Sequence, residues 1–487
     1  MTEKYHKNHQ MKIMLGLLIV GFVGMFSETA LNVAVAQIMS DFQIDTGTFQ
    51  LLFTGYLLMI GITLPLSGLL TKLFTTRTLT FSAMFLFIIG ALISALAPTF
   101  GLLLTGRLIQ GIAVGISLPL NFVVLLAIYP PEKRGAAMGL VGLVIMFAPA
   151  VGPTLSGILV ATLGWRFIFW VFIPVLLIAF FIALKFLENV SEVTKPQIDF
   201  MSIILSILGF GGLVFGASFA SEQGWGAPIV MICLLVGLIA VIAFCKRQLK
   251  LDSPILNIHT FTTSAFAIGT FLIVITFAII LSSMYLIPML WQQGLGLAAE
   301  QTGLIMLPAG LVNAALSILA GRLFDKHGAH LLVRIGFVIT AIGAVMLVLT
   351  PPTPSLFYVL AAHIIMMIGI PLIVSPAQMY ALNSLHGPIA ADGSAIMNTL
   401  QQIGAALATA IATSFLVFGA HGKTVSELSK NDFILTSHLG FAFILGLTLI
   451  GLIVSFNVVH DHKVKEIVIE IDDDKHIEET IEVDYFD

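Results

Sequence analysis

The stretch GLLLTGRLIQGIAVGISLPLNFVVLLAI, residues 101–128, decides the fold. It is almost entirely apolar or small, and Arg107 is its only charged residue. A helix of about 20 apolar residues spans the roughly 30 Å of hydrocarbon in a bilayer, so this stretch predicts a membrane-spanning helix. The whole chain agrees, since 58% of its 487 residues are hydrophobic and 10% are charged. A soluble globular chain has about 25% charged residues, so lipid is the expected solvent.

Runs of this kind recur along the chain and predict fourteen transmembrane helices. A weak repeat, GLLTK at 68–72 and GRLFDKHG at 321–328, indicates two related six-helix bundles. The sequence therefore predicts an all-α membrane protein of two six-helix bundles plus two inserted helices. Its expected parts are a cytoplasmic N-terminus at 1–11, a first bundle at 12–187, inserted helices 7 and 8 at 199–245, a second bundle at 265–459 and an acidic cytoplasmic tail at 460–487.

Lysine and arginine positions predict the orientation. With both termini in the cytoplasm, eighteen of the 22 Lys and Arg residues fall in cytoplasmic segments, three fall outside and Arg107 lies in a span. Cytoplasmic loops of membrane proteins carry this excess of positive charge. The tail has the opposite character, because residues 460–487 carry a net charge of −8.

Two charged groups are expected deep in the membrane: Glu28 in the first predicted helix and Arg107 in the fourth. A charge at this depth costs several kcal/mol and persists where it faces a cavity or a partner. A carboxylate in such surroundings takes up a proton more readily than one in water. We therefore predict that Glu28 is a proton site on a central cavity and that Arg107 drives proton release. Structural roles, a hydrogen bond to Thr29 for Glu28 and bonds to backbone carbonyls for Arg107, are the alternatives.

Other polar residues in the predicted spans are candidates for the wall of a substrate cavity. A lone histidine on an apolar helix, such as His363, is also typical of a satisfied hydrogen-bonding group, and the polar side of the helix at 392–418 fits either a substrate path or helix packing. The candidates are Asn32, Gln110, Asn313, His363, Asn398 and Gln401.

The predicted fifth helix, GLVIMFAPAVGPTLSGILV at 142–160, combines two prolines with small residues at four-residue spacing. Proline removes a hydrogen bond from the helix and bends it, and small residues allow close approach of a neighbouring helix. We predict a bent gating helix, with a plain packing helix as the alternative. The residues involved are Ala148, Pro149, Gly152, Pro153, Ser156 and Gly157.

The segment GRLFDKHG is expected to form a cytoplasmic loop. Gly321 and Gly328 permit tight turns there, and Asp325 is placed to cap the next helix, predicted at 331–350. Enzyme chemistry is not indicated, because the spans hold no paired carboxylates, His pair or Ser/His set. ATP-driven pumping is disfavoured as well, because the chain has no phosphate-binding G-x-x-x-x-G-K-[ST] loop.

Five motifs together resemble the major facilitator superfamily, and more narrowly its fourteen-helix drug:proton antiporters of the multidrug and lincomycin-resistance type. These motifs are RLIQG (107–111), APAVGPTLSG (148–157), GWRFIFWVFIP (164–174), LPAG with GRLFDKHG (307–310 and 321–328) and NTLQQIGAALATA (398–410). The resemblance covers about residues 12–459 and implies proton-driven export of amphipathic compounds. It also implies that Asp325 latches the two bundles.

Two segments, the first helix and the loop after the second, depart from the family pattern. Ser27 stands where the family has an Asp in its first helix, and the acid follows as Glu28. Lys72 and Thr75 stand where the family has Asp and Gly after its second helix. The implied latch is therefore weakened at Gly68, Lys72 and Arg77, and intact at Gly321, Asp325 and Gly328.

The resulting prediction is a proton-coupled exporter of neutral to monocationic amphipathic drugs, working by alternating access. Its rivals are a carrier of one physiological solute and a transporter-shaped membrane sensor. The expected partners are the lipid bilayer, amphipathic small molecules and protons. We expect no nucleic acid, no metal and no cofactor, with a proton gradient as the energy source. A monomer in a bacterial plasma membrane, with both termini cytoplasmic, completes the prediction.

Overall fold

The computed structural model describes residues 7–458 apart from 45, 191–192, 195–198, 252–253, 386–388 and 420–428. The predicted acidic tail at 460–487 and residues 1–6 lie outside this part. The helices are α1 (Lys7–Ala30), η2 (Leu31–Val33), α2 (Val35–Phe42), α3 (Thr46–Leu73), α4 (Thr76–Leu96), α5 (Phe100–Ile128), α6 (Pro131–Leu163), α7 (Arg166–Phe186), α8 (Phe200–Gln223), α9 (Pro228–Gln248), η3 (Ile258–Thr262), α10 (Ser264–Met289), η4 (Leu290–Gly294), α11 (Ala299–His327), α12 (Ala329–Val348), α13 (Leu356–Asn383), α14 (Ile389–Gly419) and α15 (Lys430–Ser455).

Membrane-spanning helices make up nearly all of the described chain. Thirteen helices are long and apolar enough to cross a membrane, and α6 gives a fourteenth if its two segments, Lys133–Pro149 and Thr154–Leu163, form one span. These segments meet at an angle of 42°, which is the bend that the prolines predict. The all-α membrane fold expected from the sequence is confirmed.

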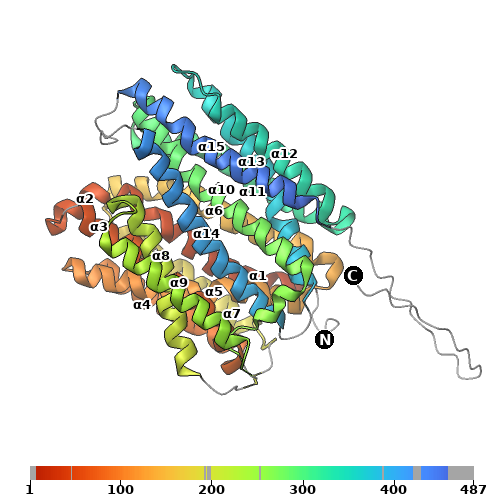
Figure 1. Cartoon of the computed structure of the whole chain (residues 1–487). Coiled ribbons are helices and arrows are strands. Elements are labelled where there is room, and N and C mark those ends of the chain that lie inside the picture. Colours follow the sequence, from red (N-terminus) through yellow and green to blue (C-terminus); the bar gives the residue numbers. More distant parts are fainter. Residues whose placement is uncertain are drawn as a thin grey trace, which may run out of the picture.

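The helices pack as two bundles with an inserted pair. Helices α1 and α3–α7 form the first bundle and α10–α15 the second, while α8 and α9 pack on each other. Figure 1 shows the second bundle above the first, with α8 beside α3 and α9 packed on α8. The bundles meet where α6 packs on α11 and where α3 packs on α14, and α8 contacts both α3 and α14.

Successive spans alternate in direction, so α1 begins and α15 ends at the same end of the molecule. We call this the inner end, because it carries Lys72 and Arg134 and is the side predicted to face the cytoplasm. The opposite end is the outer end.

The first span is shorter than the sequence predicts. The apolar run at 12–37 predicts one long first helix, but α1 stops at Ala30 and η2 turns the chain into α2. Gln37 Nε2 donates to the Val160 carbonyl oxygen at 3.2 Å, so α2 is held on the outer end of α6. Near the C-terminal end of α2, Asp41 Oδ2 accepts hydrogen bonds from Trp165 Nε1 at 2.8 Å and from Arg166 Nη1 at 3.0 Å. Both bonds favour the ionised form and hold the pKa of Asp41 below its usual value.

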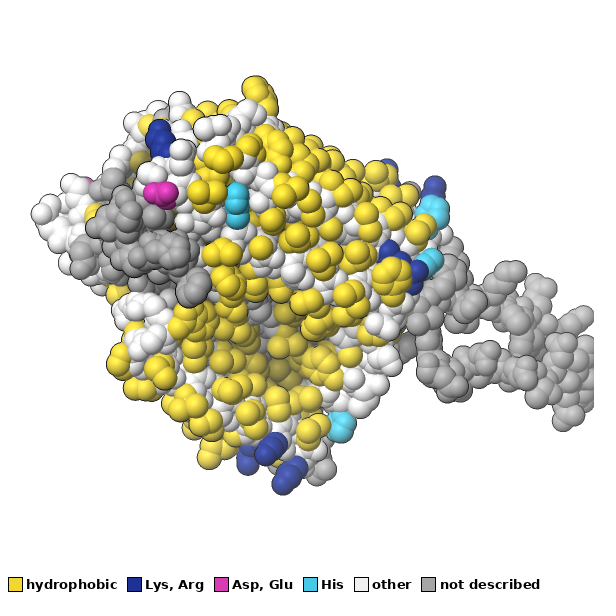
Figure 2. All heavy atoms as spheres, turned by 45° about the horizontal axis from the view of Figure 1, so that its top comes forward, with side chains coloured by type: hydrophobic (Ala, Val, Ile, Leu, Met, Phe, Trp, Pro, Cys, Tyr) yellow, Lys and Arg dark blue, Asp and Glu magenta, His cyan; other side chains and the backbone are white. Residues whose placement is uncertain are grey.

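The sides of the bundles, between the inner and outer ends, are apolar. Large exposed side chains such as Phe181, Ile239 and Ile453 are more than half exposed, which water would disfavour and lipid accepts. Figure 2 shows hydrophobic side chains over most of one face, with Lys and Arg side chains towards its ends and a hollow near its middle.

Candidate functional site

A cavity of about 640 Å³ lies between the two bundles, in the outer half of the molecule. Its wall is mainly apolar and includes four methionines, Met25, Met284, Met289 and Met306, with Phe53 and Phe277. Unbranched methionine side chains adapt to irregular ligands, and a concave apolar wall with few polar groups is typical of small-molecule sites. The polar residues on the wall are Glu28, Thr29, Thr54, Tyr56, Ser218, Tyr285, Gln292, Thr302, Gln402 and Thr409.

Glu28 is the only ionisable acid or base, tyrosines aside, among the described residues that line this cavity. It is half-buried, and its carboxylate makes no hydrogen bond to a described residue. Arg107 is close enough for its charge to act on this carboxylate, although no direct ion pair joins them in the described part of the chain. The wall therefore presents one unshared carboxylate to a bound molecule.

Arg107 is fully buried behind Glu28. Its Nη1 donates to Ser27 Oγ at 2.6 Å and to Gln110 Oε1 at 3.0 Å, and its Nη2 donates to the Ser27 carbonyl at 3.3 Å. The guanidinium also lies 4.0 Å from the ring centre of Tyr56, a favourable cation–π distance. Arg107 is thus held by dipoles and a ring, and among the described residues no carboxylate binds it directly.

The Tyr56 ring is fixed in turn, because its hydroxyl donates to the Gly24 carbonyl oxygen at 2.8 Å. Tyr56 also lines the cavity, so this one ring joins the buried arginine to the cavity wall. No motif in the sequence singled it out.

The structure explains the shifted acid in α1. Ser27 takes the place that faces Arg107, and Glu28, about 100° further round the helix, faces the cavity. Both predicted coupling residues are therefore in the site, with Ser27 between them.

The bent part of α6 packs on α1 within the first bundle. Pro149 lines the cavity, and its carbonyl oxygen accepts a hydrogen bond from Thr29 Oγ1 at 3.3 Å. A helix would normally supply this bond from residue 153, but Pro153 has no N–H. Gly152 contacts Thr29 so closely that a Cβ would overlap its hydroxyl oxygen. Ala148 and Ser156 are fully buried and Gly157 faces Val33, and the Pro153 side chain is outside the described atoms.

The other predicted wall residues do not line the cavity in this conformation. Gln110, Asn313, His363, Asn398 and Gln401 are all buried between helices. Asn313 Nδ2 of α11 donates to the Met367 carbonyl of α13 at 3.2 Å, which joins these two helices. Asn398 Nδ2 donates to the Ser394 carbonyl at 2.8 Å within its own helix, α14. The Asn32 side chain lies outside the described atoms. Gln402, the neighbour of Gln401, is on the wall instead.

The inner end is closed where α6 packs on α11. Asp325 Oδ1 accepts from the Gly135 N–H at 2.9 Å and Asp325 Oδ2 from the Ala136 N–H at 3.0 Å. Both N–H groups lie near the beginning of α6, where the helix dipole favours an anion. Asp325 therefore joins the two bundles, as the family resemblance implies.

Three expectations for this region are wrong. Asp325 does not cap α12, whose N-cap residue is Gly328 and which has no side-chain cap bond, because α11 continues to His327. Gly321 makes no turn; it lies inside α11, and a Cβ there would overlap the Gly135 carbonyl of α6. Arg77 does not reach the second bundle, since its Nη2 donates to the Leu184 carbonyl at the inner end of α7. Gly328 does make a turn, with φ +71°.

Two helical bundles that enclose a mainly apolar cavity are typical of a multi-pass membrane transporter. Among known families, the model of the Major Facilitator Superfamily matches residues 17–409. The chain belongs to this superfamily.

Relatives extend over nearly the whole chain. The Lincomycin resistance protein LmrB of Listeria innocua serovar 6a is 45% identical over 449 residues, 91% of this chain and 95% of that protein. The Bacillus subtilis (strain 168) protein of the same name is 45% identical over 455 residues, 92% of this chain and 95% of that protein. The Multidrug export protein EmrB of Haemophilus influenzae is 29% identical over 420 residues, 86% of this chain and 82% of that protein.

Solved structures share the fold at low identity. The human organic anion transporter MFSD10 matches with a TM-score of 0.65 and 14% identity, over 92% of this chain and 99% of that chain. The proton:xylose symporter XylE matches with a TM-score of 0.59 and 18% identity, over 91% of this chain and 95% of that chain.

Proposed function

We propose that this protein exports amphipathic drugs, lincomycin-type antibiotics among them, in exchange for protons. Relatives of 45% identity named as lincomycin resistance proteins support the export of such compounds. The observation that carries proton coupling is the position of Glu28: a carboxylate on the cavity wall, beside a buried arginine, where neither group has a hydrogen-bonded ionic partner among the described residues. Such a group binds either a proton or a cationic ligand, but not both at once.

The conformation fits one step of an alternating-access cycle. The cavity lies in the outer half, and the inner end is closed by α6 on α11 and by α3 on α14. In the orientation predicted from Lys and Arg, this is the outward-facing state. A proton taken up by Glu28 here would neutralise it and displace the drug, and rocking of the bundles would carry the protonated site inward.

The charge of the wall limits the substrates. Glu28 is the only acidic residue among the described wall residues, so a dication would bring an uncompensated charge into an apolar site. We infer a preference for neutral, zwitterionic and monocationic compounds. The protein would act as a monomer in the bacterial plasma membrane, with both termini cytoplasmic and the proton gradient as its energy source, without a cofactor.

Drug efflux from everted vesicles tests this function. Wild type, Glu28→Gln and the control Asp432→Asn, which changes an exposed carboxylate at the outer end of α15, would be compared with ethidium, lincomycin and a dication such as pentamidine. We expect wild type and Asp432→Asn to move ethidium and lincomycin when a proton gradient is applied, and Glu28→Gln to lose most of this gradient-driven transport.

Three results would count against the proposal. Undiminished gradient-driven transport by Glu28→Gln would place coupling elsewhere, with His363 the next group to test. Efficient export of the dication would remove the charge argument. No transport of any compound in a broad panel by wild type would favour a carrier of one solute or a sensor.

A further inference from the structure

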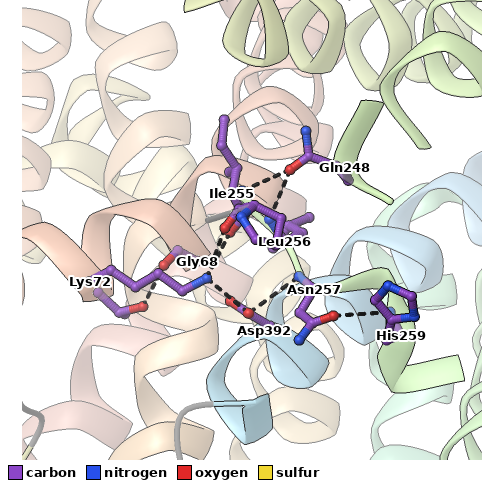
Figure 3. Close-up of polar contacts among 10 residues, drawn as sticks. Gly68, Lys72, Gln248, Ile255, Leu256, Asn257, His259 and Asp392 are labelled. Carbon is purple, nitrogen blue, oxygen red and sulfur yellow. Dashed lines mark hydrogen bonds and ion pairs between the residues drawn. The ribbon is translucent and has the colours of Figure 1, made fainter. Parts of the chain in front are cut away.

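Lys72 of α3 and Asp392 of α14 form a buried ion pair between the two bundles at the inner end (Figure 3). Their Nζ and Oδ2 atoms are 2.9 Å apart, and the side chains are 18% and 4% exposed. This pair corresponds, in the other half of the molecule, to the contact of Asp325 with the beginning of α6. Position 72 holds a lysine where the corresponding position 325 holds an aspartate. The helix that faces Lys72, α14, supplies the Asp392 carboxylate, whereas α6 supplies backbone N–H groups to Asp325.

A third element completes this contact. Residues 254–257, which we call the strap, lead from α9 to η3 and so connect the inserted helices to the second bundle. Lys72 Nζ donates to the carbonyl oxygens of Pro254 at 3.1 Å and Ile255 at 3.3 Å. The Asn257 N–H donates to Asp392 Oδ2 at 3.2 Å. The strap therefore turns acceptors towards the lysine and a donor towards the aspartate.

The strap also lies directly on α3. A Cβ on Gly68 would be 2.6 Å from Leu256 Cδ2 and 3.4 Å from the Ile255 carbonyl oxygen. Gly68 thus has a packing role: it makes room for the strap one turn of α3 before Lys72.

The inserted helices hold the strap in this position. Gln248, at the end of α9, accepts from the Ile255 N–H at 2.7 Å through Oε1 and donates to Ser202 Oγ of α8 at 2.6 Å through Nε2. Nearby, Arg247 donates to both oxygens of Asp199 at 2.6 and 2.9 Å, which holds the pKa of Asp199 well below its usual range.

The inserted pair is fixed at the outer end as well. Trp225 Nε1, between α8 and α9, donates to Ser414 Oγ of α14 at 2.5 Å. Since α8 also packs on α3, the pair bridges the two bundles along their length.

We propose that Lys72, Asp392 and the strap form a three-part inner lock, and that the inserted helices α8 and α9 serve to hold its third part. Backbone groups of the strap determine which charge each position must carry. Two carbonyls require a cation at position 72, and one N–H requires an anion at position 392. Opening the inner end then requires the strap to release both bundles. This inference deepens the proposed alternating-access function and rests on it.

Accessibility of a buried cysteine tests the lock without any substrate. In the full chain with Cys233 and Cys245 changed to alanine, Ser394→Cys supplies a reporter. Ser394 is fully buried near Asp392, and its hydroxyl makes no hydrogen bond to a described residue. The rate of reaction with a maleimide in inside-out vesicles then measures how often the inner end opens.

Charge reversals separate this lock from a simple ion pair. We expect Lys72→Asp and Asp392→Lys each to raise the labelling rate by roughly tenfold or more, because each leaves a buried charge without its partner. The double swap should stay fast, because the strap then faces an aspartate with carbonyls and a lysine with an N–H. Return of the double swap to the wild-type rate, or unchanged rates in the single variants, would overturn the proposal.

A second variant tests the inserted helices and leaves both charges in place. Gln248→Ala frees the strap from α8 and α9, and Lys246→Ala, at an exposed site two residues earlier, is the matched control. We expect faster labelling in Gln248→Ala alone, with thermal midpoints and elution profiles showing that all variants are folded. Equal labelling of Gln248→Ala and wild type would show that the inserted pair does not hold the lock.

The labelling result and the transport result are independent. A lock that behaves as expected in a protein that moves no drug would leave the lock standing and refute the proposed function. Active drug transport, with a labelling rate that none of these changes alters, would refute the lock and leave the proposed function standing.

Discussion

Ser27 and Glu28 are neighbours in the chain but meet different surroundings, because one residue turns an α-helix by about 100°. Ser27 gives its hydroxyl and carbonyl oxygens to the buried guanidinium of Arg107, and Glu28 reaches the cavity. An acid at position 27 would neutralise Arg107 directly. A serine there leaves the positive charge to act on Glu28, which fits the proposed exchange of a proton for a cationic ligand.

The loss of stability on removing the Ser27 hydroxyl tests whether Ser27 holds Arg107. Ser27→Ala leaves Arg107 Nη1 with Gln110 as its remaining side-chain acceptor, and loss of a partner by a buried charged donor costs about 1–3 kcal/mol. We expect a clearly lower thermal midpoint for the purified protein. Ser67→Ala is the control, since Ser67 is equally buried but donates only within its own helix, to the Leu64 carbonyl. Equal midpoints for the two variants would mean that Ser27 does not hold the arginine.

Helices α6 and α11 show why the inner end closes tightly. Gly135 and Gly139 of α6 lie against Gly321 and Ser317 of α11 with backbone touching backbone. Without side chains between them, the two helices approach closely enough for Asp325 to reach the N–H groups of α6. Close approach of this kind depends on small residues.

A bulky residue at this crossing should hold the bundles apart. Gly321→Val places methyl groups against the Gly135 carbonyl, so we expect faster maleimide labelling of a Ser317→Cys reporter, which is buried at the same crossing. Gly446→Val in α15 is the control, because nothing lies within 4 Å of a Cβ at that glycine. A Gly321→Val protein that is folded and labels as slowly as the control would contradict closure by this crossing.

Sequence reasoning reached the helices and the charged centre but not the rest of the wall. The length of apolar runs marks each span, and a lone acid such as Glu28 is conspicuous among apolar residues. The rotation of each helix is not readable, because a helix in this fold meets apolar surroundings on all sides, in lipid as well as in protein. For that reason the sequence places Asn313 and Asn398 on the cavity and gives no sign of Tyr56. Asp392 was missed because it is the first residue of the helix expected at 392–418, and not a charge deep inside a span.

At the scale of the whole molecule, the two halves use the same geometry with different charges. One inner contact joins Asp325 to the N–H groups of α6, and the other joins Lys72 to Asp392 and the strap. The first depends on the two bundles alone. The second includes the segment after α9, so the inserted helices belong to the moving parts and not only to the lipid-facing surface. The inserted pair also reaches the cavity, because Val214, Ala217 and Ser218 of α8 line its wall.

Proton release on drug binding tests the central claim, that Glu28 exchanges a proton for substrate. Purified protein in weakly buffered detergent solution would receive a saturating amount of ethidium while a pH indicator is followed. By linkage, we expect wild type to release up to about one proton per bound ligand, and Glu28→Gln to bind ethidium, more weakly, without release. Release from Glu28→Gln equal to that of wild type would contradict the account.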